Sequence, residues 1–171
     1  MASTSLRIGL LSDTHGYMDD RILHHLMEVD EIWHAGDVGD LAVTDALAEL
    51  APIKVVYGNI DGAKIRSEFP LHHKFMAGGL RVWMTHIGGK PGWYDYRIRE
   101  QVLRDKPDLF ICGHSHILKV QKDKRIDGVF MNPGAAGRHG IHKVRTLLRF
   151  NIMDKQLKDL EVVELGSRAR E

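Results

Sequence analysis

Five short apolar runs in this chain of 171 residues are each followed within a few residues by a carboxylate, an amide or an imidazole. The runs end near residues 11, 35, 57, 85 and 112, and each has the length of a buried β-strand. A glycine lies close to the polar side chains in every case. Because open α/β sheets bind their ligands at the carboxyl ends of strands, the repetition favours one shared site over five unrelated turns.

The first run, Leu6 to Leu11, leads into Asp13 and His15. Residues two apart in an extended chain point to the same side, so this carboxylate and this imidazole can bind one object, such as a metal ion. The polar side chains after the later runs are, in chain order, Asp37, Asn59, His86, and His114 with His116.

Each of these residues also has an ordinary structural role open to it. Asp37 can cap a helix, Asn59 can hold a turn, and His86 can be a buried core histidine. Seven nitrogen and oxygen donors are too many for one ion with an open position, which typically takes about three protein ligands. They suit two divalent ions that share one carboxylate.

The order of the expected elements predicts an α/β fold. Helices are expected from Asp19 or Asp20 to about Glu28 and over 41–50, and they alternate with the first three strands, which predicts a parallel sheet in this half. From His72 onward the pattern changes to strands joined by turns such as Asp154-Lys155, with one helix expected over 94–104. We expect a single domain over residues 1–171.

Composition argues against several function classes. The 24 Lys and Arg residues nearly balance 23 Asp and Glu, and a net charge of +1 offers no extended surface for duplex nucleic acid. No apolar run approaches the ~20 residues that span a bilayer, and the Leu6 to Leu11 run lacks the flanks of a signal peptide. We therefore expect a cytoplasmic protein with no membrane partner. The single cysteine, Cys112, excludes a disulfide framework.

The chain contains, in order, the motifs Asp13-x-His15, Gly36-Asp37, Gly58-Asn59, His86 and Gly113-His114-x-His116. This series resembles the motifs of the calcineurin-like metallophosphoesterases. The Ser-Asp-Thr-His-Gly opening and Asn132-Pro133-Gly134 are most similar to the small YfcE-type phosphodiesterases. The resemblance implies a four-layer α/β/β/α sandwich of two mixed sheets, with a dinuclear site at one edge. It implies that the first metal is held by Asp13, His15, Asp37 and His116. The second would be held by Asp37, Asn59, His86 and His114.

The resemblance also implies a reaction. A water or hydroxide that bridges two divalent cations attacks the phosphorus of a phosphodiester, while Asn59 and His114 contact the phosphate. The expected substrate is a small phosphodiester, including nucleotide-derived ones. Family precedent favours manganese, and the mixed nitrogen and oxygen donors also admit iron, zinc, nickel or cobalt.

One position departs from the family. Many members have a histidine directly after the ligand asparagine, where it is thought to protonate the leaving group, and here that residue is Ile60. Because isoleucine cannot donate a proton, we expect the proton to come from water or from another residue such as Asp61. Aryl phosphodiesters should then be cleaved faster than alkyl phosphomonoesters.

Two other functions and several histidines are left open. The same fold serves as a scaffold subunit of the retromer coat with an incomplete metal site, and it also occurs in nucleases with additional DNA-capping segments. Here every ligand position is filled, and the chain has neither the length nor the basic surplus of such a nuclease. Formation of a homo-oligomer also remains open.

The roles of several histidines are left open as well. His34 either orients a metal ligand or is a core histidine. Surface or turn positions are expected for His72, His73, His139 and His142.

Overall fold

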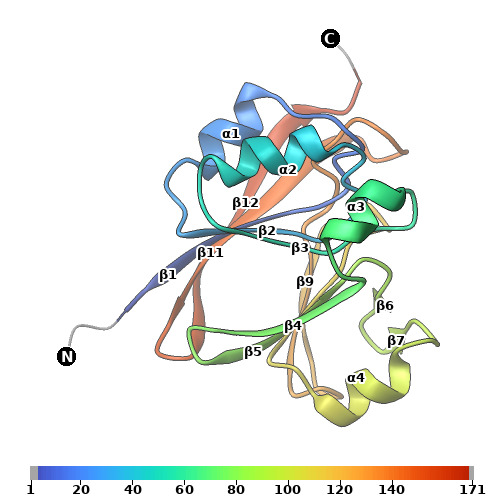
Figure 1. The fold of residues 1–171 in the computed structure, drawn as a ribbon. Helices are drawn as coiled ribbons and strands as arrows, with labels where there is room; N and C mark the ends of the chain where they lie inside the picture. The colour runs from blue at the N-terminus through green and yellow to red at the C-terminus, as the bar shows by residue number, and fades with distance from the viewer. Residues whose placement is uncertain (1–3, 170–171) are drawn as a thin grey trace.

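The computed structural model describes residues 4–169 as two five-stranded sheets packed face to face, with helices on both outer sides (Figure 1). The first sheet contains, in spatial order, β12 (Gln156–Ser167), β11 (Val144–Met153), β1 (Leu6–Leu11), β2 (Glu31–His34) and β3 (Ile53–Val55). The second contains β4 (His72–Ala77), β5 (Leu80–Thr85), β8 (Leu109–Ile111), β10 (Gly128–Asn132) and β9 (Lys119–Asp123). Each sheet has both parallel and antiparallel pairs.

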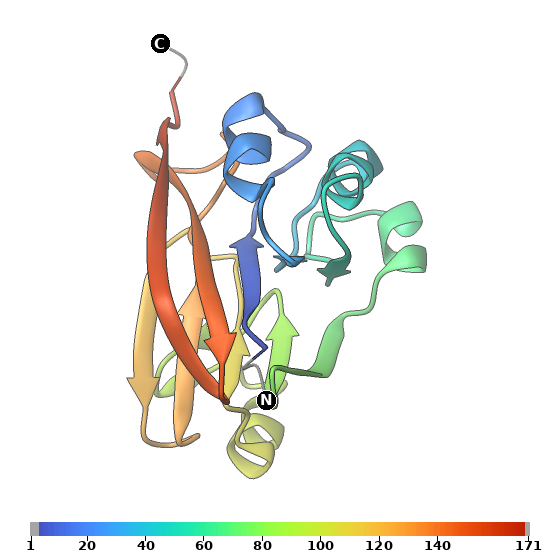
Figure 2. The ribbon, with the colours of Figure 1, turned by 90° about the vertical axis from the view of Figure 1, so that its left-hand side faces the viewer.

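Helices complete the four layers. The first sheet is covered by α1 (Asp20–Leu26), α2 (Leu41–Ala48) and α3 (Ala63–Glu68), and the second by α4 (Arg99–Asp105). Figure 2 shows α4 at the opposite end of the molecule from the blue and teal helices. The predicted α/β/β/α sandwich of two mixed sheets is therefore confirmed. None of these helices in the described part of the chain is long and apolar enough to cross a membrane.

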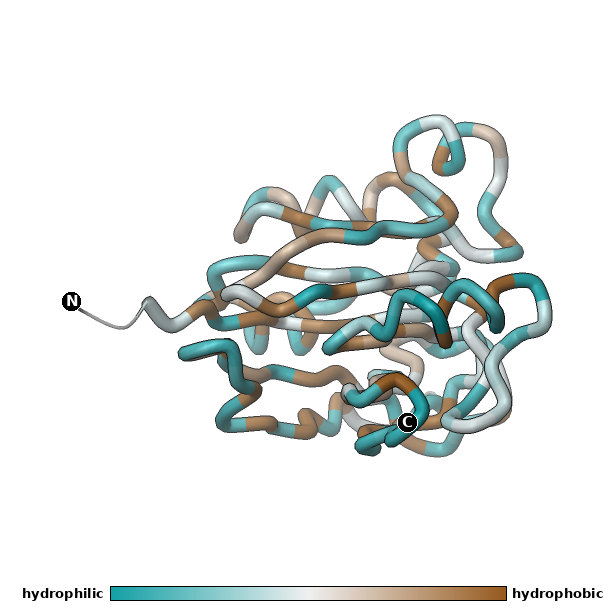
Figure 3. Tube along the Cα trace, turned by 90° about the horizontal axis from the view of Figure 1, so that it is seen from below, coloured by the Kyte–Doolittle hydropathy of each residue, from teal (hydrophilic) through white to brown (hydrophobic). Residues whose placement is uncertain are grey.

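Three apolar clusters hold the layers together, because consecutive strand residues point to opposite faces of a sheet. In β2, Ile32 packs under the helices while Trp33 lies between the sheets. In β8, Phe110 packs toward α4 and Ile111 lies between the sheets. Figure 3 shows the corresponding hydrophobic stretches along the strands in the middle of the molecule.

Two segments differ from expectation. The helix expected over 94–104 forms only as α4, because Trp93–Tyr94 (β7) instead pairs with Gly89–Lys90 (β6). The six-residue helix α3 was not predicted. The expected turn at Asp154-Lys155 is present, and both residues take positive φ values, 53° and 58°, as a tight two-residue hairpin turn requires.

The topology aligns the strands that precede the candidate ligands. In the first sheet β1, β2 and β3 are mutually parallel, and in the second β5 runs parallel to β8. The carboxyl ends of parallel neighbours lie at the same edge of a sheet. The loops after these five strands therefore meet at one edge of the sandwich.

Candidate metal centre

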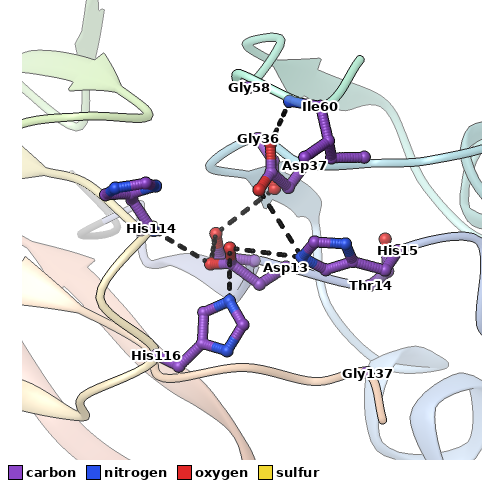
Figure 4. Close-up of polar contacts among 12 residues, drawn as sticks. Asp13, Thr14, His15, Gly36, Asp37, Gly58, Ile60, His114, His116 and Gly137 are labelled. Atoms are coloured by element: carbon purple, nitrogen blue, oxygen red, sulfur yellow. Dashed lines mark hydrogen bonds and ion pairs between the residues drawn. The ribbon is translucent and has the colours of Figure 1, made fainter. Parts of the chain in front are cut away.

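The carboxylates and imidazoles predicted as ligands converge in two groups of three. Within each group, one donor atom from every residue lies within 4.8 Å of the others. Asp13, His15 and His116 form the first group, and Asp37, His86 and His114 form the second. Figure 4 shows His15, His114 and His116 arranged around Asp13.

Asp13 lies at the centre of the first group and is fully buried. Its Oδ2 accepts hydrogen bonds from the Ser12 hydroxyl (2.6 Å) and the His114 backbone N–H (3.1 Å). Its Oδ1 lies 3.1 Å from Nε2 of His116 and 3.8 Å from Nε2 of His86. Burial raises the pKa of Asp13, but these rings and Ser12 outweigh it and hold the pKa below its ordinary value.

Asp37 lies between the two groups. Its Oδ1 accepts a hydrogen bond from the Ile60 backbone N–H at 3.1 Å. Its Oδ2 is 3.2 Å from Nε2 of His86 in the second group and 3.5 Å from Nε2 of His15 in the first. Burial raises the pKa of Asp37, and the larger combined effect of the His86 ring and the other neighbours lowers it below its ordinary value. The carboxylate is thus ionised and within reach of both groups.

His86 presents its Nε2 atom to the two carboxylates of the site. Its Nδ1 lies 2.7 Å from the carbonyl oxygen of Ala35, and since a carbonyl only accepts, Nδ1 carries the proton. The neutral ring then has its lone pair on Nε2, toward Asp37 and Asp13. Burial lowers the pKa of His86, and the two carboxylates more than offset this, so the pKa is raised.

Three buried nitrogen and oxygen atoms of the candidate ligands lack a hydrogen-bond partner among residues 4–169. They are Asp13 Oδ1, His15 Nε2 and His86 Nε2. Buried polar atoms without partners are costly and rare in folded proteins. Carboxylate oxygens and imidazole lone pairs that face one another repel unless a cation lies among them. The donors therefore fit divalent metal ions.

Backbone strain is concentrated in the same residues. Five of the ten described non-glycine residues with positive φ belong to the two groups. They are Asp13 (55°), His15 (46°), Asp37 (53°), His114 (68°) and His116 (59°). Such conformations cost energy and cluster at functional sites. Nothing in the sequence indicated them.

Two glycines without side chains let the loops that carry the candidate ligands approach each other closely. A Cβ on Gly58 would lie 2.0 Å from Oδ1 of Asp37, and one on Gly113 would lie 2.7 Å from Oδ2 of Asp13. A side chain at either position would displace a candidate ligand. These glycines precede Asn59 and His114 in the chain, so the two motifs depend on them for close approach.

Asp61, expected as a proton donor, has a different role. Its carboxylate accepts hydrogen bonds from the backbone N–H groups of Val38 (3.1 Å), Gly39 (2.8 Å) and Gly58 (2.8 Å). Both oxygens of the Asp61 carboxylate are therefore used as acceptors. Asp61 instead ties the loop that carries Asp37 to the loop that carries Asn59, and the expectation is corrected accordingly.

Asn59, Arg66 and Arg97 line a cavity of about 300 Å³ beside His86. The backbone carbonyl of Asn59 accepts a hydrogen bond from Arg66 at 3.3 Å, and the Arg66 guanidinium stacks over Tyr57. The cavity wall also contains apolar side chains, including Leu71 and Ile98. The role of Asn59 as a metal ligand remains a prediction.

His34 supports both groups from the core. Its Nδ1 accepts from the Gly36 backbone N–H (3.1 Å), so Nε2 carries the proton that it donates to Thr14 Oγ1 (2.9 Å). Thr14 lies between Asp13 and His15. Full burial lowers the pKa of His34 to about 4, which keeps the ring neutral. His34 thus orients the segments that carry the ligands.

Two histidines that sequence analysis assigned to the surface lie against the site. His139 stacks on His15 with ring centroids 4.6 Å apart, and His142 Nδ1 lies 3.3 Å from His116 Nδ1. Both belong to the loop between β10 and β11, more than twenty residues after His116 and outside the metal-ligand motifs, so spacing could not associate them with the site. His139 is exposed and His142 is half-buried in this loop, which agrees with the expected surface or turn positions, but their contacts with the ligand rings were not predicted.

Comparisons with known proteins agree with this geometry. The sequence profile of the calcineurin-like phosphoesterase superfamily domain matches residues 6–155. The chain belongs to this superfamily. It is 29% identical over 133 residues to a probable metallophosphoesterase of Methanothermobacter thermautotrophicus, an alignment that covers 75% of this chain and 76% of the relative.

Solved structures of other proteins share the fold. An archaeal phosphodiesterase superposes with a TM-score of 0.73 at 21% identity, covering 93% of this chain and 99% of that chain. Vps29 of Entamoeba histolytica, complexed with zinc, superposes with a TM-score of 0.68 at 18% identity, covering 94% of this chain and 100% of that one. At these identities the similarity establishes the fold alone.

Proposed function

We propose that this chain is a metal-dependent phosphodiesterase that uses two divalent cations, with Asp37 shared between them. The observation that carries the proposal is the pair of three-residue groups, in which three buried donor atoms lack hydrogen-bond partners among residues 4–169. When bound, two such cations ionise a water near neutral pH and neutralise charge on the phosphoryl oxygens. The protein's part is to hold the ligand atoms of the two groups in place. The His114 side chain is exposed, so its ring is available to contact the phosphate of the substrate.

The cavity beside the second group supports a diester substrate. A monoester needs space only for its phosphate and one alcohol, whereas a diester has a second substituent to place. The cavity adjoins Asn59 and His86, and it combines the guanidinium groups of Arg66 and Arg97 with apolar wall residues such as Leu71. Asp95, which binds Arg97, also lines the cavity, so the wall suits a flat, polar substituent such as the base of a nucleotide-derived diester.

Leaving-group chemistry follows from Ile60 and Asp61. The Ile60 side chain is 47% exposed at the site and has no proton to give, and Asp61 is committed to three backbone donors. We propose that the proton comes from water, so leaving groups that depart as stable anions are favoured. Manganese is the proposed metal.

The experiment compares hydrolysis after chelation and after readdition of manganese, zinc, nickel or cobalt. Bis-p-nitrophenyl phosphate, an alkyl phosphomonoester, a 2′,3′-cyclic nucleotide and single-stranded DNA serve as substrates. We expect chelation to abolish activity, manganese to restore it, and the aryl diester to react fastest. A clear monoester preference would contradict the diesterase proposal. Absence of turnover with every metal, together with a tight protein partner, would instead support a scaffold like Vps29.

A further inference from the structure

The loop between β10 and β11 holds a histidine pair that the metal-ligand motifs do not include. His142 meets His116 edge to face, with ring centroids 5.1 Å apart and their Nδ1 atoms 3.3 Å apart. His116 is a member of the first group, and its other nitrogen, Nε2, faces Asp13 at 3.1 Å. His142 therefore contacts the ring of a candidate ligand on the side away from the metal centre.

The direction of the hydrogen bonds can be worked out from one fixed acceptor. His142 Nε2 lies 3.0 Å from the carbonyl oxygen of Gly137, and because a carbonyl only accepts, Nε2 carries the proton. A neutral imidazole has one N–H, so Nδ1 of His142 bears the lone pair and accepts from Nδ1–H of His116. His116 is then left with its lone pair on Nε2, directed toward Asp13.

The loop is shaped to keep these rings together. Gly140 has a φ of 122°, and a Cβ there would lie 2.3 Å from Nδ1 of His116, so only glycine lets the backbone cross over the pair. Arg168 fixes the following residues, since its Nε donates to the His142 carbonyl at 2.8 Å and its backbone N–H donates to the Lys143 carbonyl at 2.9 Å.

We propose that His142 is a positioning residue of the metal centre. By accepting from Nδ1–H of His116, it selects the tautomer and the ring orientation in which His116 Nε2 binds a cation together with Asp13 and His15. The inference rests on the proposed metal-binding function. Partners of this kind, which hold the second nitrogen of a ligand histidine, typically contribute about 10- to 100-fold to metal affinity.

The test uses calorimetric titration of the purified, metal-free chain with Zn²⁺, comparing wild type with His142→Leu, His142→Gln and His24→Leu. We expect His142→Leu to weaken one binding event by about 10- to 100-fold. His142→Gln should restore much of the loss, because its amide oxygen can accept from His116. His24→Leu is the control, since His24 is an exposed histidine on α1 and belongs to neither group of candidate ligands. Its Zn²⁺ affinity should stay within about 3-fold of wild type.

A second readout needs no metal. In ¹⁵N-histidine NMR spectra of the metal-free wild type, His142 should carry its proton on Nε2. A proton on Nδ1 would overturn the proposal even if His142→Leu failed to fold. Unchanged Zn²⁺ affinity in a folded His142→Leu, or an equal loss in His24→Leu, would also overturn it while wild type still bound two ions. A wild type that binds no divalent ion would instead contradict the proposed function itself.

Discussion

One histidine in each group of candidate ligands has its second ring nitrogen bound by a different kind of partner. In the second group, His86 donates to the backbone carbonyl of Ala35, and its side chain is 1% exposed. In the first group, His116 contacts the side chain of His142 in a loop, and 13% of the His116 side chain is exposed. Main-chain support cannot be removed by a single side-chain substitution, whereas side-chain support can. Substitutions in the loop between β10 and β11 can therefore change the affinity of the first group for a metal ion.

The largest effect is expected from Asp37, which lies within 3.5 Å of histidines in both groups. Asp37→Asn should lower phosphodiester hydrolysis on the order of 10³-fold, because bound metals supply several kcal/mol of transition-state stabilisation. Steady-state kinetics with saturating manganese measure this. Asp45→Asn, an exposed carboxylate on α2, is the control. Loss of only one binding event with activity retained would show that Asp37 serves a single group.

Acidification should weaken both groups together through His34. Its pKa is about 4 in the folded protein, whereas an unperturbed histidine has a pKa of 6.5. The stability that His34 contributes is therefore present above pH 6.5 and is lost as the pH falls toward 4. A shift of this size in a fully buried group corresponds to about 3 kcal/mol.

Urea unfolding of the metal-free protein across this pH range measures the effect of His34. The slope of the unfolding free energy against pH should be smaller in His34→Gln than in wild type. Equal slopes in the two proteins would show that His34 does not titrate as described.

Gly36→Ala should disturb the second group through the main chain. Gly36 has a φ of 98°, and a Cβ there would lie 2.6 Å from Nδ1 of His86. We expect a loss of about 2 kcal/mol in unfolding free energy and a weaker second binding event. Gly62→Ala, where nothing lies within 4 Å of the added carbon, is the matched control in thermal unfolding and calorimetry. If Gly36→Ala behaved like Gly62→Ala, the main chain would not be what holds His86.

A smaller effect is expected from Asp61→Asn. Asparagine has one acceptor oxygen in place of two, so part of the support that Asp61 gives to the loops around Gly39 and Gly58 is lost. The cost should be about 1–2 kcal/mol in denaturant unfolding. The ratio of aryl to alkyl ester turnover should stay constant, because Asp61 gives no proton to the leaving group. A selective loss of alkyl ester turnover would restore the proton-donor role.

The smallest effect concerns the cavity beside the second group. Arg97 is exposed and bonded to Asp95, so Arg97→Gln should raise KM for a nucleotide-derived diester by about 3-fold, with little change in kcat. Arg104→Gln is the matched control, since Arg104 is also exposed and bonded to a carboxylate, Asp105. Equal KM values for the two variants would remove Arg97 from substrate binding.

Sequence patterns predicted that the candidate ligands of both groups come together, but they did not predict what supports His116 in the first group. Strand ends and parallel topology follow from apolar runs and alternation with helices, which is why Asp13, Asp37 and His86 could be associated from the order of residues alone. The partner of His116 could not, because His142 is brought to it by a loop whose path depends on Gly140 and Arg168.

The helices expected near 20–28 and 41–50 are present, but the first part of the one expected over 94–104 is not helical. Tyr94, Ile98 and Val102 are four residues apart and all pack in one cluster, as a helical face would. Tyr94 nevertheless lies in a short strand pair with Gly89, so the pattern identified the buried side chains and not their backbone conformation. The short helix α3 buries only Ile65, which is too little for a periodic signal.

The most direct test of the central claim is anomalous diffraction from crystals of the chain soaked in Mn²⁺. We expect two peaks, one among Asp13, His15 and His116 and one among Asp37, His86 and His114, with Asp37 close to both. Absence of any peak at these residues, or a single ion bound elsewhere on the surface, would contradict the two-metal centre.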